Sequence, residues 1–484
     1  RKKIAAKQQY QLEQFNHYHN LFLTAFTDGK LITDLDIDIF KLLYKPDKHS
    51  PSYKALQHIT HELKLTPLEF CHKIGLVSDL PKFFTQCFMS DNFHPENHPS
   101  YEIIIADPNA FTQRLDLQIF SIDDAATTEI DDAFSVEYKE NGYIVGIHIA
   151  APALNSSIAQ IAADNLSSVY YPGNKLTMLP ECIIQQYSLG EAKTLPVVSI
   201  YFNIDNEFNI INYTSAVNVV NIAANLRIEE LEKIFNYDSL ELNHGYNFEN
   251  ELKLLYQFAL KLEEKRGKVS THTLIKDYNL GFDGDKIYIK PRIRGNPLDK
   301  LVSELMILAN CSWGRLLTNS FIPAIYRVKQ LNYPVKTTLT PDPHCGLNVD
   351  YYTWLTSPLR RATDYINQQQ LIGLLSRKKG VYTAIDPLLL FVIENFDARY
   401  AKYMDFQNKM EKYWSLRYLI QEQITEINAV FIYKTTVQLE GVPIELDLNN
   451  FTDAKPKGTQ IRLKIYRINL VNLSFEFKLL DNPI

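Results

Sequence analysis

The sequence predicts a multidomain α+β protein, and three observations carry this prediction. Apolar residues recur at helical spacing in the first hundred or so residues, for example at Ile39, Leu42 and Leu43. A long central stretch mixes strand and helix patterns without internal repeats, and the last part of the chain holds five short runs of β-branched and aromatic residues. At 484 residues and about 150 residues per domain, we expect three domains: 1–105, 106–425 and 426–484.

The first of these domains is expected to consist of short helices separated by tight turns. The breaks fall at Lys45-Pro46-Asp47, Thr66-Pro67 and Leu80-Pro81. This pattern fits a helix-turn-helix or winged-helix-like module, and it fits a small helical docking domain equally well.

The central domain contains an unusually acidic segment at residues 122–133. Its five carboxylates are Asp123, Asp124, Glu129, Asp131 and Asp132. Strand-like runs flank the segment, and the later Asn141-Gly142 dipeptide is a strong hairpin signal. We therefore expect a loop held between strands, whose crowded negative charge a cation, a proton or an arginine must compensate.

Oxygen ligands in these numbers favour Mg²⁺, Mn²⁺ or Ca²⁺, and no His/Cys spacing in this segment indicates zinc. The segment is not an EF-hand, because glycine is missing at the sixth loop position and glutamate at the twelfth. Taken alone, an acidic loop could also be a helix cap or a solvated turn.

Composition limits the class of protein. Hydrophobic residues make up 46% and charged residues 22%, which is typical of a globular chain. Five scattered cysteines are expected to be reduced thiols, which favours a cytoplasmic location. The net charge of −6 disfavours a protein coated in basic surface for duplex DNA. No apolar run reaches the ~18 residues of a membrane span, no signal peptide is evident, and the start without Met indicates a longer natural chain.

The last domain is expected to be a five-stranded OB-type β-barrel, of the kind found in ribosomal protein S1. In its fourth strand one face carries Ile461, Leu463 and Ile465, and the other carries Arg462, Lys464 and Tyr466. Basic charge interleaved with an aromatic ring favours single-stranded nucleic acid. An ordinary barrel with a basic outer face remains the alternative.

Five segments together resemble the ribonuclease II/ribonuclease R (RNB) family: Ile122–Ala133, Gly146–Ala150, Val169–Gly173 with Met178–Pro180, Ile322–Arg327, and Thr356–Asp364. The resemblance covers residues 110–420. It implies an RNB catalytic domain over 106–425 and a processive, Mg²⁺-dependent 3′→5′ exoribonuclease that degrades single-stranded RNA to nucleoside monophosphates. A minority of this family carries a helix-turn-helix-like domain in place of the usual N-terminal cold-shock domains, which fits residues 1–105. The protein is expected to be a monomer without an obligate protein partner.

The resemblance also implies residue roles. Asp123, Glu129, Asp131 and Asp132 would hold two metal ions, about 4 Å apart in such sites, and Asp131 would be the most important of them. Tyr170 would position the last nucleotide. Arg360 would bind phosphate, near a helix start expected at Ser357-Pro358. Arg327 and Arg361 would also contact RNA, although a surface ion pair is an equal alternative for Arg361.

The chain departs from the family pattern at several positions: Glu129 and Ala151 replace aspartate, Ala362 replaces tyrosine, Gln368 replaces histidine, and a downstream glutamate aligns with Gln407 or with the nearest carboxylate, Glu411. The family uses this glutamate near the substrate, and we take Glu411 as the candidate for it and thus as a catalytic residue. These departures leave open a decayed relative that binds RNA without cleaving it. A metal-dependent hydrolase of small phosphate esters is a third possibility.

Overall fold

The computed structural model describes residues 2–29, 32, 38–93, 108–267, 275–449 and 453–480. The chain forms two compact units. The first unit comprises Arg1–Phe93, Leu280–Ile289 and Asn408–Ile484, and the second comprises His94–Asn279 and Lys290–Gln407. Three elements contribute residues to both units: β8 (Ile275–Asp283), β9 (Lys286–Arg294) and α12 (Pro387–Gln421). The domain boundaries expected at residues 105 and 425 stay a prediction.

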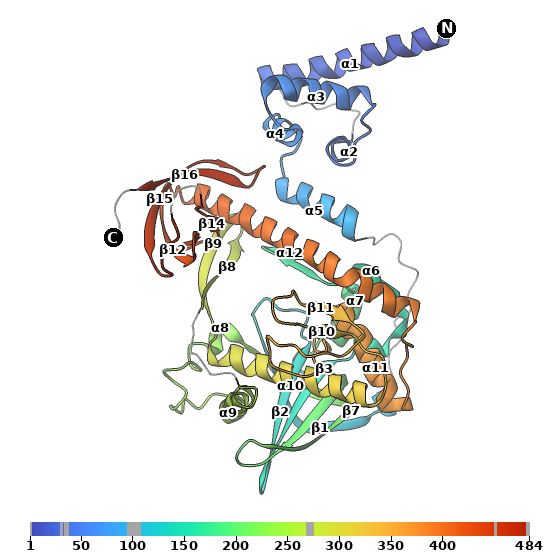
Figure 1. Ribbon diagram of the computed structural model, residues 1–484, viewed down its shortest axis with the longest axis vertical. Coiled ribbons are helices and arrows are strands. Elements are labelled where there is room, and N and C mark those ends of the chain that lie inside the picture. Colours follow the sequence, from blue (N-terminus) through green and yellow to red (C-terminus); the bar gives the residue numbers. More distant parts are fainter. Residues whose placement is uncertain are drawn as a thin grey trace. The chain divides into compact units, whose positions relative to one another are not determined.

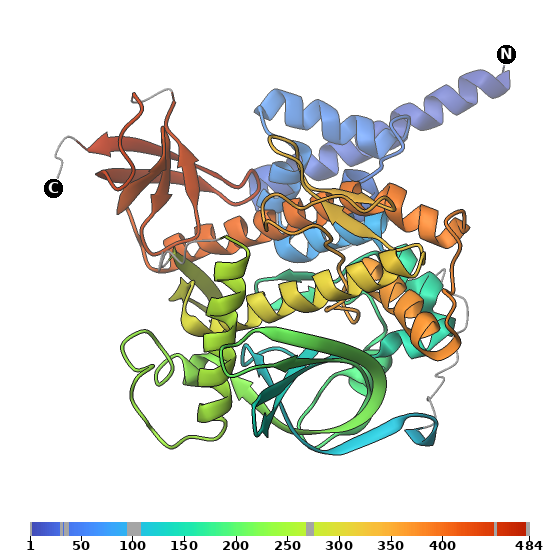
Figure 2. The same ribbon diagram turned by 60° about the horizontal axis from the view of Figure 1, so that its bottom comes forward.

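A closed five-stranded barrel forms the centre of the second unit (Figures 1 and 2). Its strands follow the order β1 (Thr112–Asp123), β2 (Asp132–Lys139), β3 (Gly142–Ala150), β6 (Thr194–Ile204) and β7 (Ile210–Arg227). Neighbouring strands are antiparallel, except that β7 pairs with β1 in parallel and thereby closes the barrel. Closure brings the ends of β1 and β7 together, with Asp123 opposite Arg227.

The hairpin between β2 and β3 confirms the signal in the sequence, with its turn one residue earlier than the dipeptide. Lys139 pairs with Gly142, so the turn residues are Glu140 and Asn141. Gly142 has φ +143°, and a Cβ there would lie 2.0 Å from the carbonyl oxygen of Ile204. Glycine is therefore needed because β6 approaches the turn so closely.

Alternate residues of the barrel strands enter two separate hydrophobic cores. Phe134, Ile147 and Ile200 belong to the core that contains α9 (Glu249–Lys265) and α10 (Pro297–Asn319). Ala133 and Ala150 belong to the other core. That core contains residues of α6 (Ala159–Asn165), α7 (Glu181–Tyr187), α11 (Ala362–Arg377) and α12. With packing on both faces, the strand ends are held rigidly, and the loop from β1 to β2 starts from a fixed frame.

Short elements complete the second unit. They are the hairpins β4 (Val169–Tyr171) with β5 (Asn174–Leu176) and β10 (Tyr326–Val328) with β11 (Lys336–Thr338), the helix α8 (Ile228–Leu231), and the 3₁₀ turns η2 (Pro108–Ala110), η3 (Pro152–Leu154) and η4 (Ser156–Ile158).

The N-terminal part of the first unit is helical, as expected. Its helices are α1 (Lys2–Asp28), α2 (Ile39–Leu43), α3 (Pro51–Leu63), α4 (Pro67–Lys73) and α5 (Leu80–Asn92). The prolines mark helix starts, since Pro51 and Pro67 each occupy the first helical position. Thr66 and Glu69 form a reciprocal capping box at the start of α4. Residues 94–105 lie outside the described residues.

The C-terminal part of the first unit contains the five expected strands: β12 (Glu426–Tyr433), β13 (Thr436–Leu439), β14 (Glu445–Asp447), β15 (Gln460–Asn469) and β16 (Ser474–Leu480). They form one antiparallel sheet in the order β14-β13-β12-β15-β16. Leu463 and Ile465 are buried in its core, whereas Arg462 and Lys464 are exposed, as the alternation predicts. The structure therefore shows a five-stranded sheet, and its closure into an OB-type barrel stays a prediction.

All five cysteines are free thiols, as expected. Among the described helices, none has the length and apolar character needed to cross a membrane.

Candidate active site

The acidic loop leaves β1 at Asp123 and enters β2 at Asp132, and the end of α7 fixes its conformation. The Ser188 hydroxyl accepts a hydrogen bond from the Ile130 amide at 2.9 Å and donates one to the Thr128 carbonyl at 2.8 Å. The Leu189 amide donates to the Ile130 carbonyl at 3.0 Å. Because these buried backbone groups are satisfied by fixed partners, the carboxylates that follow them are held in place.

The other end of the loop is held by side chains from the end of β7, from α8 and from β9. Arg227 donates to the Asp124 carbonyl at 3.1 Å, and the Glu229 carboxylate accepts from the Ala125 amide at 3.0 Å. Arg292 forms an ion pair with the Asp124 carboxylate at 3.1 Å. The charge of Asp124 is therefore neutralised within the protein.

Asp131 and Arg360 form an ion pair on one wall of the site, in which the carboxylate is buried and the guanidinium is partly exposed. Arg360 Nε lies 3.1 Å from Asp131 Oδ2, and the Leu359 amide donates to Oδ1 at 2.9 Å. Burial raises the pKa of Asp131 to about 7, while Arg360 and the Leu359 amide act against that rise. Arg360 also donates to Ser357 Oγ at 2.9 Å, which fixes the plane of its guanidinium.

The sequence suggested a helix start at Ser357-Pro358, which would place Arg360 in the first turn of a helix. The structure shows that this expectation is wrong. Helix α11 begins only at Ala362, with Arg361 at the capping position, and Arg360 lies in the preceding turn. This turn is tied to the segment that follows α6, because the Ser168 amide donates to the Arg360 carbonyl at 2.9 Å. This contact between two segments that are distant in sequence places Tyr170 and Arg360 close together in the fold.

Glu129 is surrounded by hydrogen-bond donors. Tyr170 donates to it at 2.8 Å and Ser168 at 3.0 Å, and Lys175 Nζ lies 3.5 Å away. Burial and the Glu129 charge raise the pKa of the Tyr170 phenol far above its usual range, so the hydroxyl keeps its proton. The extra methylene of Glu129 is therefore used to hold Tyr170 and Lys175.

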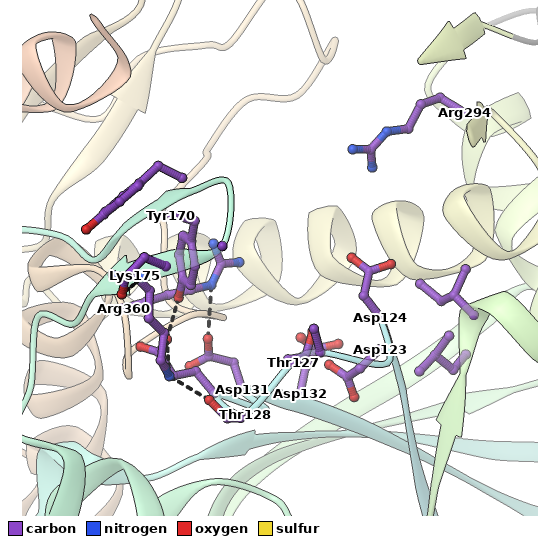
Figure 3. Close-up of a pocket in the computed structure, with 17 residues that line it drawn as sticks. Asp123, Asp124, Thr127, Thr128, Asp131, Asp132, Tyr170, Lys175, Arg294 and Arg360 are labelled. Carbon is purple, nitrogen blue, oxygen red and sulfur yellow. Dashed lines mark hydrogen bonds and ion pairs between the residues drawn. The ribbon is translucent and has the colours of Figure 1, made fainter. Parts of the chain in front are cut away.

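These residues line one open cavity of about 1050 Å³. Figure 3 shows Arg360 pointing toward Asp131, whereas Asp123 and Asp132 lie beside each other, away from Tyr170. The six predicted residues that line the cavity are Asp123, Glu129, Asp131, Asp132, Tyr170 and Arg360. The structure thus brings together residues that are up to about 240 positions apart in sequence.

Asp123 and Asp132 are the carboxylates best placed for a metal ion. Asp123 Oδ2 is buried without a hydrogen-bond partner, and burial raises the pKa of this carboxyl to about 6. Burial, followed by the charges of Asp123 and Asp131, raises the pKa of Asp132 well above its usual value. A divalent cation would relieve both effects, so the pair fits a metal ion.

The protein alone does not form a closed cage of carboxylates here. Among the described residues, no three oxygens from different side chains of the acidic loop lie within 4.8 Å of one another. This fits Mg²⁺, which commonly uses one or two carboxylates together with water and substrate phosphate. A metal-binding role for Glu129 and Asp131, which both have protein partners here, stays a prediction.

The remaining predicted RNA-binding residues do not line the cavity. In the second unit, the Arg327 and Arg361 guanidiniums lie 4.4 and 4.1 Å from the ring centroid of Trp354. Arg361 also pairs with Asp364 at 2.7 Å, but Asp364 is buried, so this is not the surface ion pair expected as its alternative role. Glu411, Arg462, Lys464 and Tyr466 belong to the first unit.

Sequence reasoning missed several residues of the site. Lys175, Ser168 and Arg294 were not singled out, although Lys175 and Arg294 line the cavity. Gln407, the other candidate for the downstream glutamate, donates to the Tyr170 carbonyl at 2.7 Å. A signal for Lys175 was available, because it lies two residues after the Val169–Gly173 segment.

Comparison with known proteins agrees with this geometry. The family model described as RNB domain matches residues 113–340, which include the barrel and the acidic loop. The chain therefore contains an RNB domain, which makes up just under half of its length. Ribonuclease R of Chlamydia muridarum is 24% identical over 327 residues, which cover 55% of this chain and 46% of that protein. The chain spans about half the length of this relative and of a similar uncharacterized ribonuclease from Synechocystis, of which it covers 52%.

Solved structures share the fold. Ribonuclease R of Mycoplasma genitalium, in complex with ribose-methylated single-stranded RNA, matches 83% of this chain and 78% of its own at a TM-score of 0.68 and 17% identity. The Dss1 exoribonuclease of Candida glabrata, as an active-site mutant, matches 95% of this chain and 69% of its own at a TM-score of 0.70 and 18% identity. Yeast Ssd1, a pseudonuclease, matches 80% of this chain and 58% of its own at a TM-score of 0.60 and 14% identity.

Proposed function

We propose that this RNB protein is a hydrolytic 3′→5′ exoribonuclease that degrades single-stranded RNA processively to nucleoside monophosphates. One observation carries the proposal: the Asp131–Arg360 and Glu129–Tyr170 pairs converge on the same open cavity as Asp123, whose buried Oδ2 has no hydrogen-bond partner. A phosphate-binding cation, an aromatic ring and acidic groups in one cavity match the needs of phosphodiester hydrolysis.

Each residue has a distinct task in this proposal. The Arg360 side chain is 42% exposed, so part of its guanidinium remains free to bind phosphate oxygens while Asp131 and Ser357 orient it. The ring of Tyr170 stacks on the terminal base, and its hydroxyl is fixed by Glu129. Tight orientation of these groups lowers the entropic cost of reaching the transition state.

Asp123 and Asp132 would hold Mg²⁺, with Mn²⁺ as a substitute, and Glu129 and Asp131 would join them in a two-metal site. When bound, the metal activates water and neutralises charge on the leaving oxygen. Because burial raises the pKa of Asp132, a proton would compete with the metal ion for this carboxylate.

The finer features of the architecture belong to the same proposal. Residues 1–105 form a helix-turn-helix-like domain, 106–425 the RNB catalytic domain, and 426–484 an OB-type barrel whose Arg462, Lys464 and Tyr466 contact RNA. Glu411, Arg327 and Arg361 contribute to the RNA path. The protein acts as a cytoplasmic monomer.

Replacement of Asp131 tests the proposal. With 5′-labelled single-stranded RNA in Mg²⁺, the native protein should produce a descending ladder, and chelation by EDTA should abolish it. Asp131→Asn should slow degradation by at least about 100-fold, because Arg360 loses its charged partner. RNA binding, followed by gel shift, should persist.

Asp238→Asn, at an exposed position in the second unit, is the matched control and should leave the ladder unchanged. An Asp131→Asn protein as fast as the native one would refute the assignment. Products with uniformly internal ends would instead indicate an endonuclease.

A second candidate is a pseudonuclease that binds RNA without cleaving it. One observation favours it: the Lys175 ammonium lies 3.5 Å from Glu129, so a fixed protein cation already balances one of the acidic side chains. This candidate predicts a gel shift with intact RNA in both Mg²⁺ and Mn²⁺. The Asp131→Asn protein, prepared in the same way and used at the same concentration, controls for contaminating ribonuclease.

A further inference from the structure

Two histidines and a glutamate meet between α1 and α3, in the helical part of the first unit. The two helices pack side by side (Figure 1). His19 projects from α1, and His58 and Glu62 project from α3 one turn apart. One ligand atom of each side chain lies within 4.8 Å of the other two, and no other described group of three such residues meets this limit.

The buried ring nitrogen of His19 is the most informative atom of this cluster. Its Nε2 has no hydrogen-bond partner. The ring stacks on Phe15 at a centroid distance of 5.8 Å and meets the His58 ring edge-on at 5.2 Å. These contacts hold the ring but give its nitrogen nothing to bind, and an unsatisfied buried polar atom costs about 1–3 kcal/mol.

His58 and Glu62 offer the complementary ligands from an accessible position. His58 Nδ1 and Glu62 Oε2 are 3.8 Å apart, and the side chains are 53% and 58% exposed. A cation from solvent can therefore reach both, and a water molecule has room to complete its coordination. A weak surface ion pair would explain these two residues but not the unsatisfied nitrogen of His19.

We propose that His19, His58 and Glu62 bind a first-row transition-metal ion of the Zn²⁺ type. Two imidazoles, one carboxylate and one water form a common zinc ligand set, with bonds of about 2.0–2.2 Å. Tetrahedral geometry at those lengths separates ligand atoms by roughly 3.4 Å. The three ligand atoms now lie within 4.8 Å of one another, so each would have to move closer to the others by less than about 2 Å to bind the ion. Imidazole ligands make Mg²⁺ and Ca²⁺ poor occupants, unlike the acidic loop of the second unit.

The bound ion would fasten α1 to α3. Helix α1 has few deeply buried apolar side chains, and these, Phe22 and Ala25, lie in its C-terminal part. His19 lies about one turn before them, so a metal bond there extends the attachment toward the exposed N-terminal part of the helix. The site is therefore structural, and its effect should be seen in the mobility of α1.

The test is metal binding by the whole chain. After removal of metal, equilibrium dialysis against Zn²⁺ should show one bound equivalent in the native protein that is absent in His19→Ala and His58→Ala. The controls are His17→Ala and His61→Ala, which change histidines of the same two helices outside the cluster and should retain this equivalent. Co²⁺ should give the intense visible absorption of tetrahedral coordination in the native protein, and this band should be lost in the first two variants only.

Glu62→Gln guards against loss of folding, because Glu62 is exposed and should tolerate the change. It should weaken Zn²⁺ binding at least about tenfold without altering the circular dichroism spectrum. Zn²⁺ should also slow hydrogen exchange of α1 amides in the native protein. Unchanged stoichiometry and Co²⁺ spectrum in His19→Ala and His58→Ala would overturn the site, and binding without slower exchange would overturn its structural role.

Discussion

Side-chain length at Glu129 changes how the acidic loop is used. An aspartate at this position would retract the carboxylate by about 1.5 Å, one carbon–carbon bond. It could not then contact both Ser168 at 3.0 Å and Tyr170 at 2.8 Å. The departure from the family pattern therefore couples the loop to the aromatic ring that we propose for the terminal base.

Two substitutions at Tyr170 separate its ring from its hydroxyl. Tyr170→Phe keeps the stacking surface but loses the contact to Glu129, so RNA affinity should stay within about threefold while the cleavage rate falls. Tyr170→Ala should weaken binding of the RNA 3′ end by about 1–3 kcal/mol, or roughly 5- to 150-fold. Fluorescence titration and single-turnover rates measure the two effects.

Tyr138→Ala is the control for both variants, since Tyr138 is also a tyrosine of the second unit and is 54% exposed. Equal losses in Tyr170→Phe and Tyr170→Ala would show that the hydroxyl, and not stacking, governs binding.

The sequence located the acidic residues, Tyr170 and Arg360 because each lies in a recognisable local pattern. It could not locate Ser168 or Lys175, whose roles come from contacts made across the fold. Position 368 shows the same limit. The Gln368 side-chain amide donates to the Ala150 carbonyl at 2.8 Å and accepts from the Ala153 amide at 3.3 Å. These two backbone groups lie before and after Ala151 in the chain. Two separate departures from the family pattern are thus neighbours in space.

The end of α7 controls the acidic loop through one hydroxyl group. Ser188→Ala would leave the Ile130 amide and the Thr128 carbonyl without that partner. Loss of a buried hydrogen bond should destabilise the second unit by about 1–3 kcal/mol. The loop should also loosen, so activity should fall by more than the unfolded fraction explains.

Thermal melting and cleavage assays at a temperature well below the transition measure both effects of Ser188→Ala. Ser157→Ala provides the comparison. The Ser157 hydroxyl donates a hydrogen bond of 2.7 Å to Asn155, and neither residue belongs to the acidic loop. A Ser188→Ala protein with native stability and native rate would show that the loop does not depend on α7.

A buried polar group inside the barrel strands makes stability depend on pH. His148 of β3 lies between Ser135 and Ser199, at 2.9 Å from each hydroxyl. Burial, reinforced by the charge of Arg114, lowers its pKa to about 3. At a pH below about 6.5, the ordinary pKa of histidine, the unfolded chain binds a proton at this position and the folded chain does not. The free energy of unfolding therefore decreases as the pH falls below that value.

At pH 5 this loss should amount to about 2 kcal/mol, from 1.36 kcal/mol per pH unit. In His148→Gln the proton is absent from both states, so the stability gap between the native protein and the variant should narrow from pH 7 to pH 5. Denaturant unfolding at both pH values measures that gap, and a constant gap would contradict the assigned pKa.

Local signals predicted the separate elements better than their assembly. Prolines and capping residues marked the helix starts, and alternation marked the β12–β16 strands. Barrel closure was not predictable, because β1 and β7 pair across roughly a hundred residues and no local pattern records such a contact. The turn at Arg360 was misread for the same reason: its partner is the distant Ser168 segment.

On the scale of the whole molecule, the proposed binding of RNA by a chain with net charge −6 requires local positive charge. The five-stranded sheet of the first unit has such a place. Lys464 of β15 and Lys478 of β16 are direct antiparallel partners, so both side chains lie on the same face. Like charges in that arrangement destabilise a sheet unless an anion compensates them. Glu426 of β12 lies opposite Lys464 on its other side but forms an ion pair with Arg462 at 3.0 Å, so a phosphate of bound RNA would supply the anion for the lysine pair.

Neutralising this lysine pair should therefore affect long RNA and spare short RNA. In Lys464→Gln/Lys478→Gln, the affinity for a long single strand should fall, and the slope of log affinity against log salt should shrink by about 0.7 per lost phosphate contact. Turnover of a tetranucleotide should stay native, since we propose that cleavage takes place in the cavity of the second unit. Lys457→Gln, at an exposed lysine outside both strands, should change neither quantity. A native salt slope in the double variant would remove this sheet from the RNA path and leave the proposed cleavage site untouched.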